Sequence, residues 1–520
     1  MRARSLLSVV SLALAGLAGV PTTSTPAVPA PPTRGDLRWL SRVTFGIDTA
    51  TVARYRSLGR EQFLDEQLHP SAGDPANLAA AVAAIPVTHQ TAQARVTANR
   101  AEQQRITTLQ GDDEKQKARD ALNQTGNQAI YETTKRQLMR ALYSPSQLRE
   151  QLTWFWMNHF SVFSGKANAR WTLAEYEEQT VRAHALGTFH DLVMATATSP
   201  AMLEYLDNAQ SAVGKINENY ARELMELHTL GVSGGPSGST YSQADVQELA
   251  RVLTGVGLNV TDNTPKLPAH QQALYVRRGL FEFNPARHDF GAKTVLGHAI
   301  TGKGLAEVEE AVGWLCRQPA TARFISTKLA TYFVADEPPP ALVERMTRTF
   351  QKTDGSIAAV LREMLLDGAL TAALNAPTLK LEKFKDPMQF VVSSMRLAYD
   401  GKTIANYHPV IGWLQQLGEP LYGRVTPDGY ALTEAAWSSS GQMVRRFEIA
   451  RAIGSGNAGL FNNDDNTPGP STGFPMLTSR LFFETIDPAL GSRVREALGR
   501  ASSQQEWNTI LLASPDWMQR

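Results

Sequence analysis

The chain has almost no cysteine and, beyond its first residues, no long hydrophobic run. Cys316 is the only cysteine among 520 residues, so no internal disulfide can form. It lies in an apolar helical pattern, W-L-C-R-Q, which indicates a buried small hydrophobe rather than a reactive thiol. No later apolar stretch approaches the roughly 20 residues of a membrane-spanning helix. Stability must therefore come from a hydrophobic core, in one large domain or two closely packed ones.

Net charge is also nearly absent. Lysine and arginine number 51 against 50 aspartates and glutamates, which gives +1. A chain this close to neutral has no general electrostatic attraction for nucleic acid or for anionic lipid. We therefore expect neither nucleic acid nor a membrane surface as a partner.

The first residues are typical of an export signal. Arg2 and Arg4 form a short basic start, and Leu6–Val20 is an apolar run of signal-peptide length. Proline and threonine dominate Pro21–Thr33, and no cysteine follows that would carry a lipid anchor. Residues 1–30 are predicted to be a signal peptide and processed leader, which makes the mature protein soluble and periplasmic or secreted.

Helical periodicity outweighs strand patterning in the rest of the chain. Apolar residues recur at helical spacing in most segments, and Ser242 with Asp245 three residues later predicts a capped helix start. Only Leu274–Val276 and Leu280–Phe283 resemble short strands. We predict a mainly α fold: residues 31–520 form one large multi-helix domain with long loops and at most a small β element.

A polar segment interrupts this pattern. From His89 to Leu142 the chain is rich in Gln, Ala, Arg, Glu and Asn, and its apolar spacing is weak until Ile130. A break is expected near Gly111, where two aspartates follow. Residues 88–142 are therefore predicted to form a helical arm or insertion.

The densest group of ionisable residues is Asn217–Gly231, N-E-N-Y-A-R-E-L-M-E-L-H-T-L-G. On a helical wheel, one face within about 140° carries Glu218, Asn219, Arg222, Glu223 and Glu226. One interpretation is an ordinary amphipathic helix with an i, i+4 charge ladder on its outer face. The other is the lining of a site. His228 falls on the apolar side and is expected to be a packing histidine.

Polar pairs elsewhere favour the site interpretation. Asn158-His159 lies inside the aromatic run Trp154–Phe160, Asp207-Asn208 ends a helix, and His288-Asp289 lies on a loop. Burying such groups costs free energy unless they meet polar partners. Aromatic rings beside carboxylates and amides suit a carbohydrate, and paired carboxylates are the usual equipment for glycoside cleavage.

We therefore hypothesise a hydrolase that acts on a glycan or another extended polymer. Glu223 with Glu226 or Glu218 would supply acid and base, and Arg222 would hold one carboxylate ionised. His288 and Asp289 are further catalytic candidates. Substrate contacts are expected from Arg222, Asn219, Asp207, Asn208, Asn158, His159, Trp154 and Trp156. A polysaccharide is the expected substrate, and no cofactor is expected.

Two alternatives stay open. In the first, the cluster is the structural network of a non-enzymatic exported scaffold or carrier. In the second, histidine and carboxylates hold a metal for hydrolysis, although no H-E-x-x-H, C-x-x-C or calcium-loop spacing is present.

Several motifs follow one another in a specific order along the chain. They are L-S-R-V-T-F-G at 40–46, W-F-W-M-N-H-F at 154–160, Y-L-D-N at 205–208, the cluster at 217–231, L-T-G at 253–255, H-D at 288–289, K-D-P at 385–387 and P-D-G-Y at 427–430. In this order they resemble a large bacterial family catalogued as domain of unknown function 1800.

The resemblance implies an exported, mostly helical bacterial protein of unsettled activity. It also implies a partner, because such proteins are often encoded beside a second exported family of sulfatase-like appearance. The chain departs from the family at Val256 and at Tyr430, where members often carry Trp. These departures concern substrate contacts more than the fold.

Overall fold

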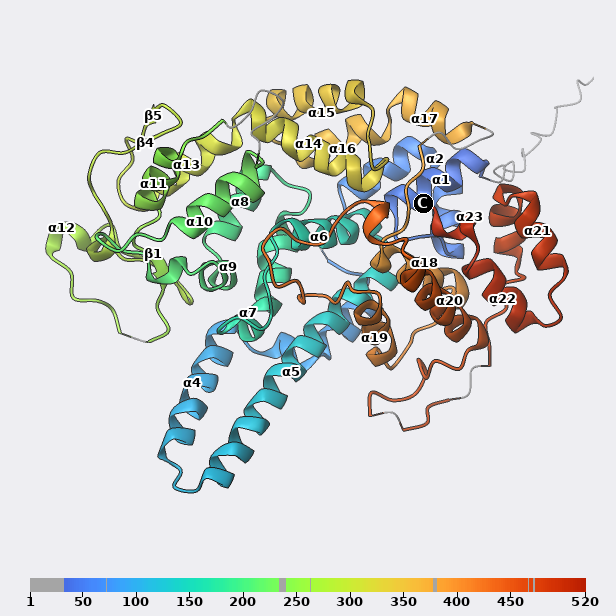
Figure 1. Cartoon of the computed structure of the whole chain (residues 1–520), viewed down its shortest axis with the longest axis horizontal. Coiled ribbons are helices and arrows are strands. Elements are labelled where there is room, and N and C mark those ends of the chain that lie inside the picture. The colour runs from blue at the N-terminus through green and yellow to red at the C-terminus, as the bar shows by residue number, and fades with distance from the viewer. Residues whose placement is uncertain are drawn as a thin grey trace, which may run out of the picture.

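The computed structural model describes residues 32–71, 73–232, 240–261, 263–376, 381–465, 467–470 and 473–520. The signal peptide expected within residues 1–30 lies outside these ranges. Figure 1 shows a broad body built almost entirely of helices, from which one helical pair projects. The predicted mainly α fold is confirmed.

Helices form where the sequence repeats apolar residues at helical spacing. In the first half of the chain they are α1 Arg34–Val43, α2 Thr49–Leu68, α3 Ala76–Ala83, α4 Ala92–Thr108, α5 Asp112–Tyr143, α6 Gln147–His159, α7 Ala169–Glu175, α8 Phe189–Ala197, α9 Pro200–Tyr205, α10 Glu218–Glu223 and α11 Gln243–Val252. Two helices continue into wider π-helical turns, η2 Tyr176–Arg182 after α7 and η4 Leu224–Thr229 after α10.

The second half of the chain adds the remaining helices of the body. They are α12 Ala269–Gln272, α13 Leu305–Cys316, α14 Pro319–Phe333, α15 Pro340–Lys352, α16 Ile357–Leu365, α17 Gly368–Asn375, α18 Pro387–Tyr399, α19 His408–Gln416, α20 Ser440–Ser455, α21 Ser492–Gly499, α22 Gln504–Leu512 and α23 Pro515–Met518.

The β structure is small, as predicted. A three-stranded antiparallel sheet has the order β1-β3-β2, and β4 with β5 makes a separate two-stranded ladder. The strands are β1 Val256–Leu258, β2 Val276–Arg278, β3 Phe281–Phe283, β4 Thr294–Val295 and β5 His298–Ala299. The expected strand Leu280–Phe283 contains β3, whereas the expected strand Leu274–Val276 overlaps β2 only at Val276. Strand β1 is too short to show alternation in the sequence.

The main hydrophobic core runs through the body, with members from Leu37 to Met518, and a second small cluster joins Ala92, Val96, Trp171 and Leu280. Its largest fully buried side chains include Trp39 and Trp156. Cys316, at the end of α13, is 6% exposed. Burial raises the pKa of its thiol, which fits the expected packing role.

The last residues of the chain return to its beginning, where Figure 1 marks the C-terminus beside α1 and α2. The guanidinium of Arg520 is buried and donates to the carbonyl oxygens of Tyr332 at 3.0 Å and Arg42 at 3.1 Å. The ammonium of Lys385 lies 3.6 Å from the ring centre of Trp517. These contacts join α1, α14 and the segment before α18 to the end of the chain.

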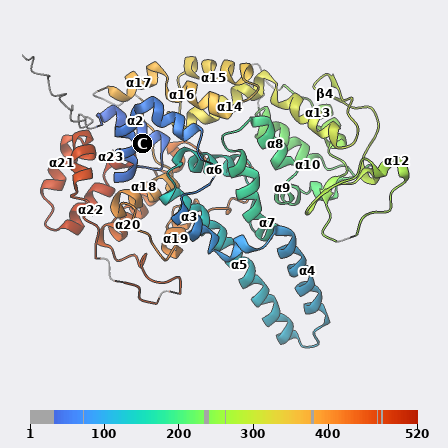
Figure 2. The same ribbon diagram turned by 180° about the vertical axis from the view of Figure 1, so that it is seen from behind.

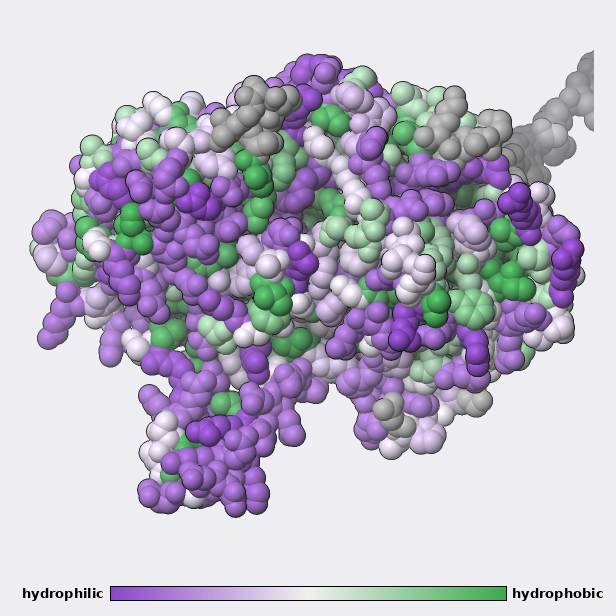
Figure 3. Space-filling model, viewed as in Figure 1, coloured by the Kyte–Doolittle hydropathy of each residue, from purple (hydrophilic) through white to green (hydrophobic). Residues whose placement is uncertain are grey.

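The predicted arm is the antiparallel pair α4 and α5, which projects from the body in both Figure 1 and Figure 2. The helices are separated near Gly111, as expected. Hydrophilic residues cover most of the projecting part (Figure 3). The last turns of α5, including Leu138 and Leu142, are buried in the core. The projection is therefore shorter than the predicted range of 88–142.

Candidate functional site

The predicted ionisable cluster lies on α10 and the π-helical turn η4. Asn217 begins the helix, since its side-chain oxygen accepts from the backbone N–H of Asn219 at 2.8 Å. Tyr220 and Met225 are fully buried and fix the inner face. The Thr229 hydroxyl donates to the Leu224 carbonyl at 2.7 Å within the widened turn. Such π-helical turns occur frequently at functional sites.

The expected charge ladder is present but loose. Arg222 lies 3.8 Å from Glu218 and 3.7 Å from Glu226, and the three side chains are 37%, 33% and 24% exposed, respectively. Gln243 of α11 joins the ladder, because it accepts from Arg222 at 2.7 Å and donates to Glu218 at 2.6 Å. Partly solvated pairs of this kind contribute about 0–1 kcal/mol each to stability.

Glu223 differs from its neighbours in the cluster. It is half-buried, and among the described residues its carboxyl makes no hydrogen bond or ion pair. Burial raises its pKa, and the negative charges of Glu226 and Asp428 raise it further against the opposing effect of Arg222. Glu223 therefore keeps its proton to a higher pH than an ordinary glutamate.

Glu226 lies three residues further on and has different surroundings. Arg222 provides a nearby cation, and the hydroxyl of Tyr241 is hydrogen-bonded to the Glu226 carboxylate. Burial and this carboxylate together raise the pKa of Tyr241, which therefore stays a hydrogen-bond donor. The two glutamates thus form a pair with contrasting environments on one helix face.

Asp428 comes from the long loop between α19 and α20. Burial would raise its pKa, but hydrogen bonds from Arg424 at 2.8 Å and Thr426 at 2.5 Å lower it overall. Asp428 acts electrostatically on both Glu223 and Lys328. These three groups therefore belong to one charged neighbourhood assembled from three separate parts of the chain.

Lys328 of α14 meets His159 of α6. Its ammonium lies 2.9 Å from Nδ1 of His159, and Nε2 of His159 lies 3.1 Å from the backbone oxygen of His228. Because Lys328 donates to Nδ1, the ring proton of His159 is placed on Nε2. Burial lowers the pKa of Lys328 to about 8, although Asp428 acts in the opposite direction.

His228 is fully buried beside the Phe160 ring, with 5.0 Å between ring centres. Neither ring nitrogen has a hydrogen-bond partner among the described residues. Burial lowers its pKa to about 3, so the ring is neutral. Its burial fits the expected packing role, but two unpaired ring nitrogens carry a desolvation cost.

Asn158 holds the Asp428 loop in place. Its side-chain oxygen accepts from the Tyr430 backbone N–H at 2.6 Å, and its amide donates to the Tyr430 carbonyl at 3.0 Å. Gly429 has a positive φ of 76°, and a Cβ there would lie 2.2 Å from the Asn158 carbonyl oxygen. Only glycine therefore permits this close approach of the loop to α6.

Trp154 and Trp156 are packing residues in this structure. Trp156 is fully buried and its indole N–H donates to the Ala185 carbonyl at 3.0 Å. Trp154 is 5% exposed and stacks on Tyr430 with 6.5 Å between ring centres. Their expected role as stacking surfaces for a substrate does not fit this burial.

The adjacent residues Asp207 and Asn208 differ in their burial and in their contacts. Asn208 is fully buried and its amide donates to the carbonyls of Leu253 at 3.3 Å and Val256 at 3.1 Å, which fixes the start of β1. Asp207 is exposed and pairs with Lys166 at 2.9 Å. Asn208 is thus inaccessible to a substrate, while Asp207 remains accessible.

His288 and Asp289 belong to a different network. His288 is buried, with Nε2 3.1 Å from Glu307, which also pairs with Lys293 at 2.6 Å. Asp289 pairs with Arg251 at 2.8 Å, and hydrogen bonding from Arg251 lowers the Asp289 pKa to about 2. Arg251 is eight residues, or about 12 Å, along α11 from Gln243, which contacts the cluster. The structure therefore does not bring this pair to the glutamates.

Lys328, Asp428 and Tyr241 were not among the residues predicted for the site. The sequence contains a weak indication for Lys328. This lysine lies at helical spacing from Ile325 and Tyr332, which are both buried, so it belongs to the inner face of α14. Asp428 belongs to the P-D-G-Y motif, whose place in the fold the sequence could not reveal.

Gly231–Gly235 reads G-V-S-G-G, which fits the spacing of a serine nucleophile turn. That motif requires a preceding strand, whereas here the π-helical turn η4 precedes it. Ser233 lies outside the described residues.

Metal-binding clusters and membrane-spanning helices are both absent from the described residues. Within the described ranges, no three His, Cys, Asp or Glu side chains gather in a way that could hold a metal ion. In the same ranges, every helix is too short or too polar to cross a membrane.

Fold and site together define a mainly α-helical protein with a carboxylate pair beside a buried lysine–histidine contact. The chain belongs to the family described as protein of unknown function (DUF1800), whose sequence model matches residues 38–519. No curated protein and no solved structure matches the chain. The resemblance noted from the motifs is therefore confirmed.

Proposed function

We propose that the protein is an exported hydrolase that cleaves a glycan or another extended polymer by acid–base catalysis at Glu223 and Glu226. The supporting observation is the contrast within this pair. Glu223 is half-buried, forms no hydrogen bond or ion pair with another described residue and has a raised pKa, whereas Glu226 has Arg222 and Tyr241 beside it. Titratable pairs with contrasting environments are characteristic of acid–base catalysts.

In this proposal Glu223 is the general acid and protonates the leaving oxygen. Glu226 is the carboxylate that acts as base or nucleophile. Residues three apart on a helix have Cβ atoms about 5–6 Å apart. The two carboxyl groups can therefore approach each other, and a separation of ~5–5.5 Å would correspond to cleavage with retention at the anomeric carbon.

Substrate binding in this proposal uses the solvated part of the cluster. Arg222 and Asn219 lie on the same helix face, and Arg424 holds Asp428 at the edge. Because these side chains are partly exposed, they suit a polymer that passes over the surface. Asn158 and Gly429 position the Asp428 loop, and Lys328 with His159 supports it from the buried side.

The test is turnover of a polysaccharide panel by the purified protein, with and without an exported sulfatase-like protein, the partner that the family resemblance implies. Glu223→Gln and Glu226→Gln should each lower the rate by about 10²–10⁴-fold, because each removes a proton-transfer group. Glu448→Gln, an exposed change on α20, is the control. Melting temperatures should stay within a degree or two. Full activity without either carboxylate would refute the proposal.

A non-enzymatic scaffold or carrier is the second candidate. The solvated ladder and the projecting arm favour it, because both also suit a surface that docks another protein. In this case Glu223→Gln would leave every turnover assay negative and would instead change the association with the sulfatase-like partner, measured by light scattering of the mixed proteins.

A further inference from the structure

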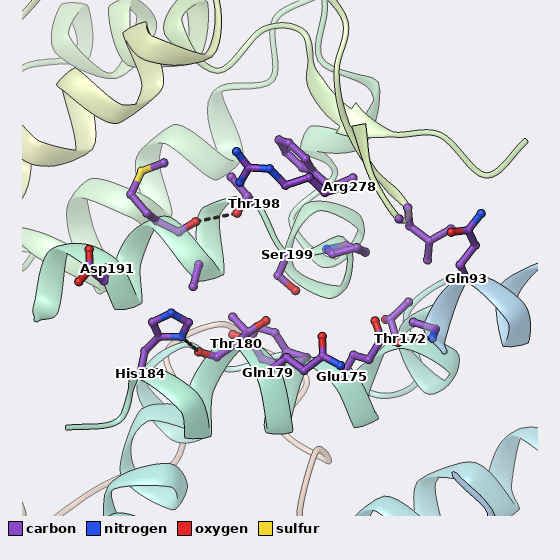
Figure 4. Close-up of a pocket in the computed structure, with 18 of the residues that line it drawn as sticks. Gln93, Thr172, Glu175, Gln179, Thr180, His184, Asp191, Thr198, Ser199 and Arg278 are labelled. Carbon is purple, nitrogen blue, oxygen red and sulfur yellow. Dashed lines mark hydrogen bonds between the residues drawn. The ribbon is translucent and has the colours of Figure 1, made fainter. Parts of the chain in front are cut away.

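A cavity of about 860 Å³ lies apart from the glutamate cluster. It is lined by the helix α7–η2, by α8, by the start of α4 and by the hairpin of β2 and β3 (Figure 4). Ligand sites commonly have volumes of about 300–1,000 Å³. None of the residues predicted from the sequence to form the site lines it.

The π-helical turn η2 gives this cavity a rigid wall. Glu177 and Arg182 of η2 point inward, where Glu177 pairs with Arg136 and Arg182 pairs with Glu150 at 2.8 Å. Gln179 and Thr180 of the same turn line the cavity. The buried ion pairs therefore fix the backbone that presents these two polar side chains.

The cavity presents neutral polar groups with free hydrogen-bonding capacity. Among the described residues, the side chains of Gln179, Thr180 and Ser199 make no hydrogen bond. Ser199 is 5% exposed and begins α9 without using its hydroxyl as a cap. These groups can donate and accept together, as vicinal hydroxyls of a ligand require.

The charges of the lining disfavour an anion. Glu175, Asp191 and Glu309 line the cavity together with the guanidinium of Arg278 and the imidazoles of His184 and His190, of which His190 lies 3.3 Å from Asp191. Glu175 is already engaged by the backbone N–H of Ala92 at 2.5 Å. A neutral ligand avoids the repulsion that a carboxylate or sulfate would meet.

We infer that this cavity binds a neutral, hydroxyl-rich ligand, a short saccharide of one to three units. Gln179, Thr180 and Ser199 contact its hydroxyl groups. Phe281 and Leu305, which also line the cavity, contact its apolar C–H surface. This inference does not depend on the proposed hydrolysis, because it concerns binding at a separate place.

The test is calorimetric titration of the full protein with cellotriose, maltotriose and chitotriose, and with trigalacturonate as the charged comparison. We expect at least one neutral trisaccharide to bind and trigalacturonate to bind more weakly. Gln179→Leu should weaken binding about tenfold, because it removes hydrogen bonds to the ligand. Ala195→Phe should abolish binding by filling the space.

Gln415→Leu, an exposed change on α19, is the matched control and should bind as the unchanged protein does. Glu223→Gln should also bind normally, which separates this result from the hydrolysis test. If Ala195→Phe does not fold, Gln179→Leu and Ser199→Ala carry the test. Absence of binding by all three neutral sugars, stronger binding of trigalacturonate, or unchanged affinity in Gln179→Leu would overturn the inference.

Discussion

The unusual protonation behaviour of this protein is created by contacts between distant parts of the sequence. Glu223 owes part of its raised pKa to Asp428, and the same aspartate moderates the lowered pKa of Lys328. A change at Asp428 therefore acts on an acid and on a base at once. The loop that carries Asp428 therefore influences the protonation of the site, as does the helix that carries the glutamates.

Lys328 is predicted to lower the stability of the fold at neutral pH. Its folded pKa of about 8 lies below the ordinary 10.5, so the folded state disfavours its charge. This penalty is fully present below pH 8 and is lost as pH rises toward 10.5. Lys328→Met should therefore raise stability by about 1–2 kcal/mol at pH 6.5 and by less at pH 9.5.

The measurement is urea unfolding at both pH values. Lys166→Met, at a partly solvated ion pair, is the control and should show no such pH dependence. An equal effect of Lys328→Met at the two pH values would contradict the lowered pKa.

Glu307 is predicted to be a strong structural residue. It is buried between His288 and Lys293, whose hydrogen bonds lower its pKa against the effect of burial. Glu307→Gln should cost about 3 kcal/mol at pH 7, because it leaves a buried ammonium without its counter-charge. Since a lowered carboxyl pKa stabilises only above the unfolded value, this cost should shrink as pH falls below about 4. Glu309→Gln, exposed on the same helix, should change the midpoint little in the same denaturation series.

At the scale of single residues, the sequence predicted part of the candidate site. The shared face of Glu218, Arg222 and Glu226 follows from helical spacing alone and is present. Lys328 and Asp428 could not be predicted, since their approach depends on how α6, α14 and a distant loop pack. The burial of Trp156 was equally invisible, because the sequence shows an aromatic run but not which side faces the core.

At the scale of elements, local signals were reliable where the chemistry is local. Ser242 and Asp245 form the predicted capping box at α11, and the break near Gly111 separates α4 from α5. The π-helical turns η2 and η4 were not predicted, because one extra residue per turn hardly changes an apolar pattern over six or seven residues.

The outer part of the arm is predicted to be dispensable for folding. Residues 103–117 bury only one apolar side chain, Ile106. Replacing 103–117 with Gly-Ser-Gly should change the melting temperature by no more than about 3 °C. By contrast, Leu138→Ala in the buried end of α5 should cost about 2–5 kcal/mol. Thermal unfolding followed by circular dichroism compares the two, and a large loss on trimming would show that the arm supports the core.

At the scale of the whole molecule, one core joins the beginning and end of the described chain. Arg520 satisfies the buried carbonyls of Arg42 and Tyr332, which belong to α1 and α14. Arg520→Ala should therefore cost at least about 2 kcal/mol, because buried acceptors lose their donor. Arg500→Ala, 76% exposed, is the comparison in chemical denaturation. Equal stability of the two variants would show that the contacts of Arg520 do not stabilise the fold.

The fold class followed from the sequence because helical periodicity is repeated over hundreds of residues. The cavity behind η2 did not, because its walls come from five separate segments, none of which looks unusual alone. Family membership extends the fold to related chains without adding a reaction. The glutamate cluster and the cavity are therefore two independent places at which the activity of the protein can be tested.

The reaction of Cys316 with a thiol reagent can report how often the protein opens locally. Cys316 is the sole thiol of the chain and lies buried at the end of α13. A disulfide reagent in excess can reach the buried thiol only when this part of the body opens, so the rate of its reaction at low denaturant reports how often that opening occurs. Ligands that close the molecule would slow this rate, which offers a screen for binding that needs neither a known substrate nor a known reaction.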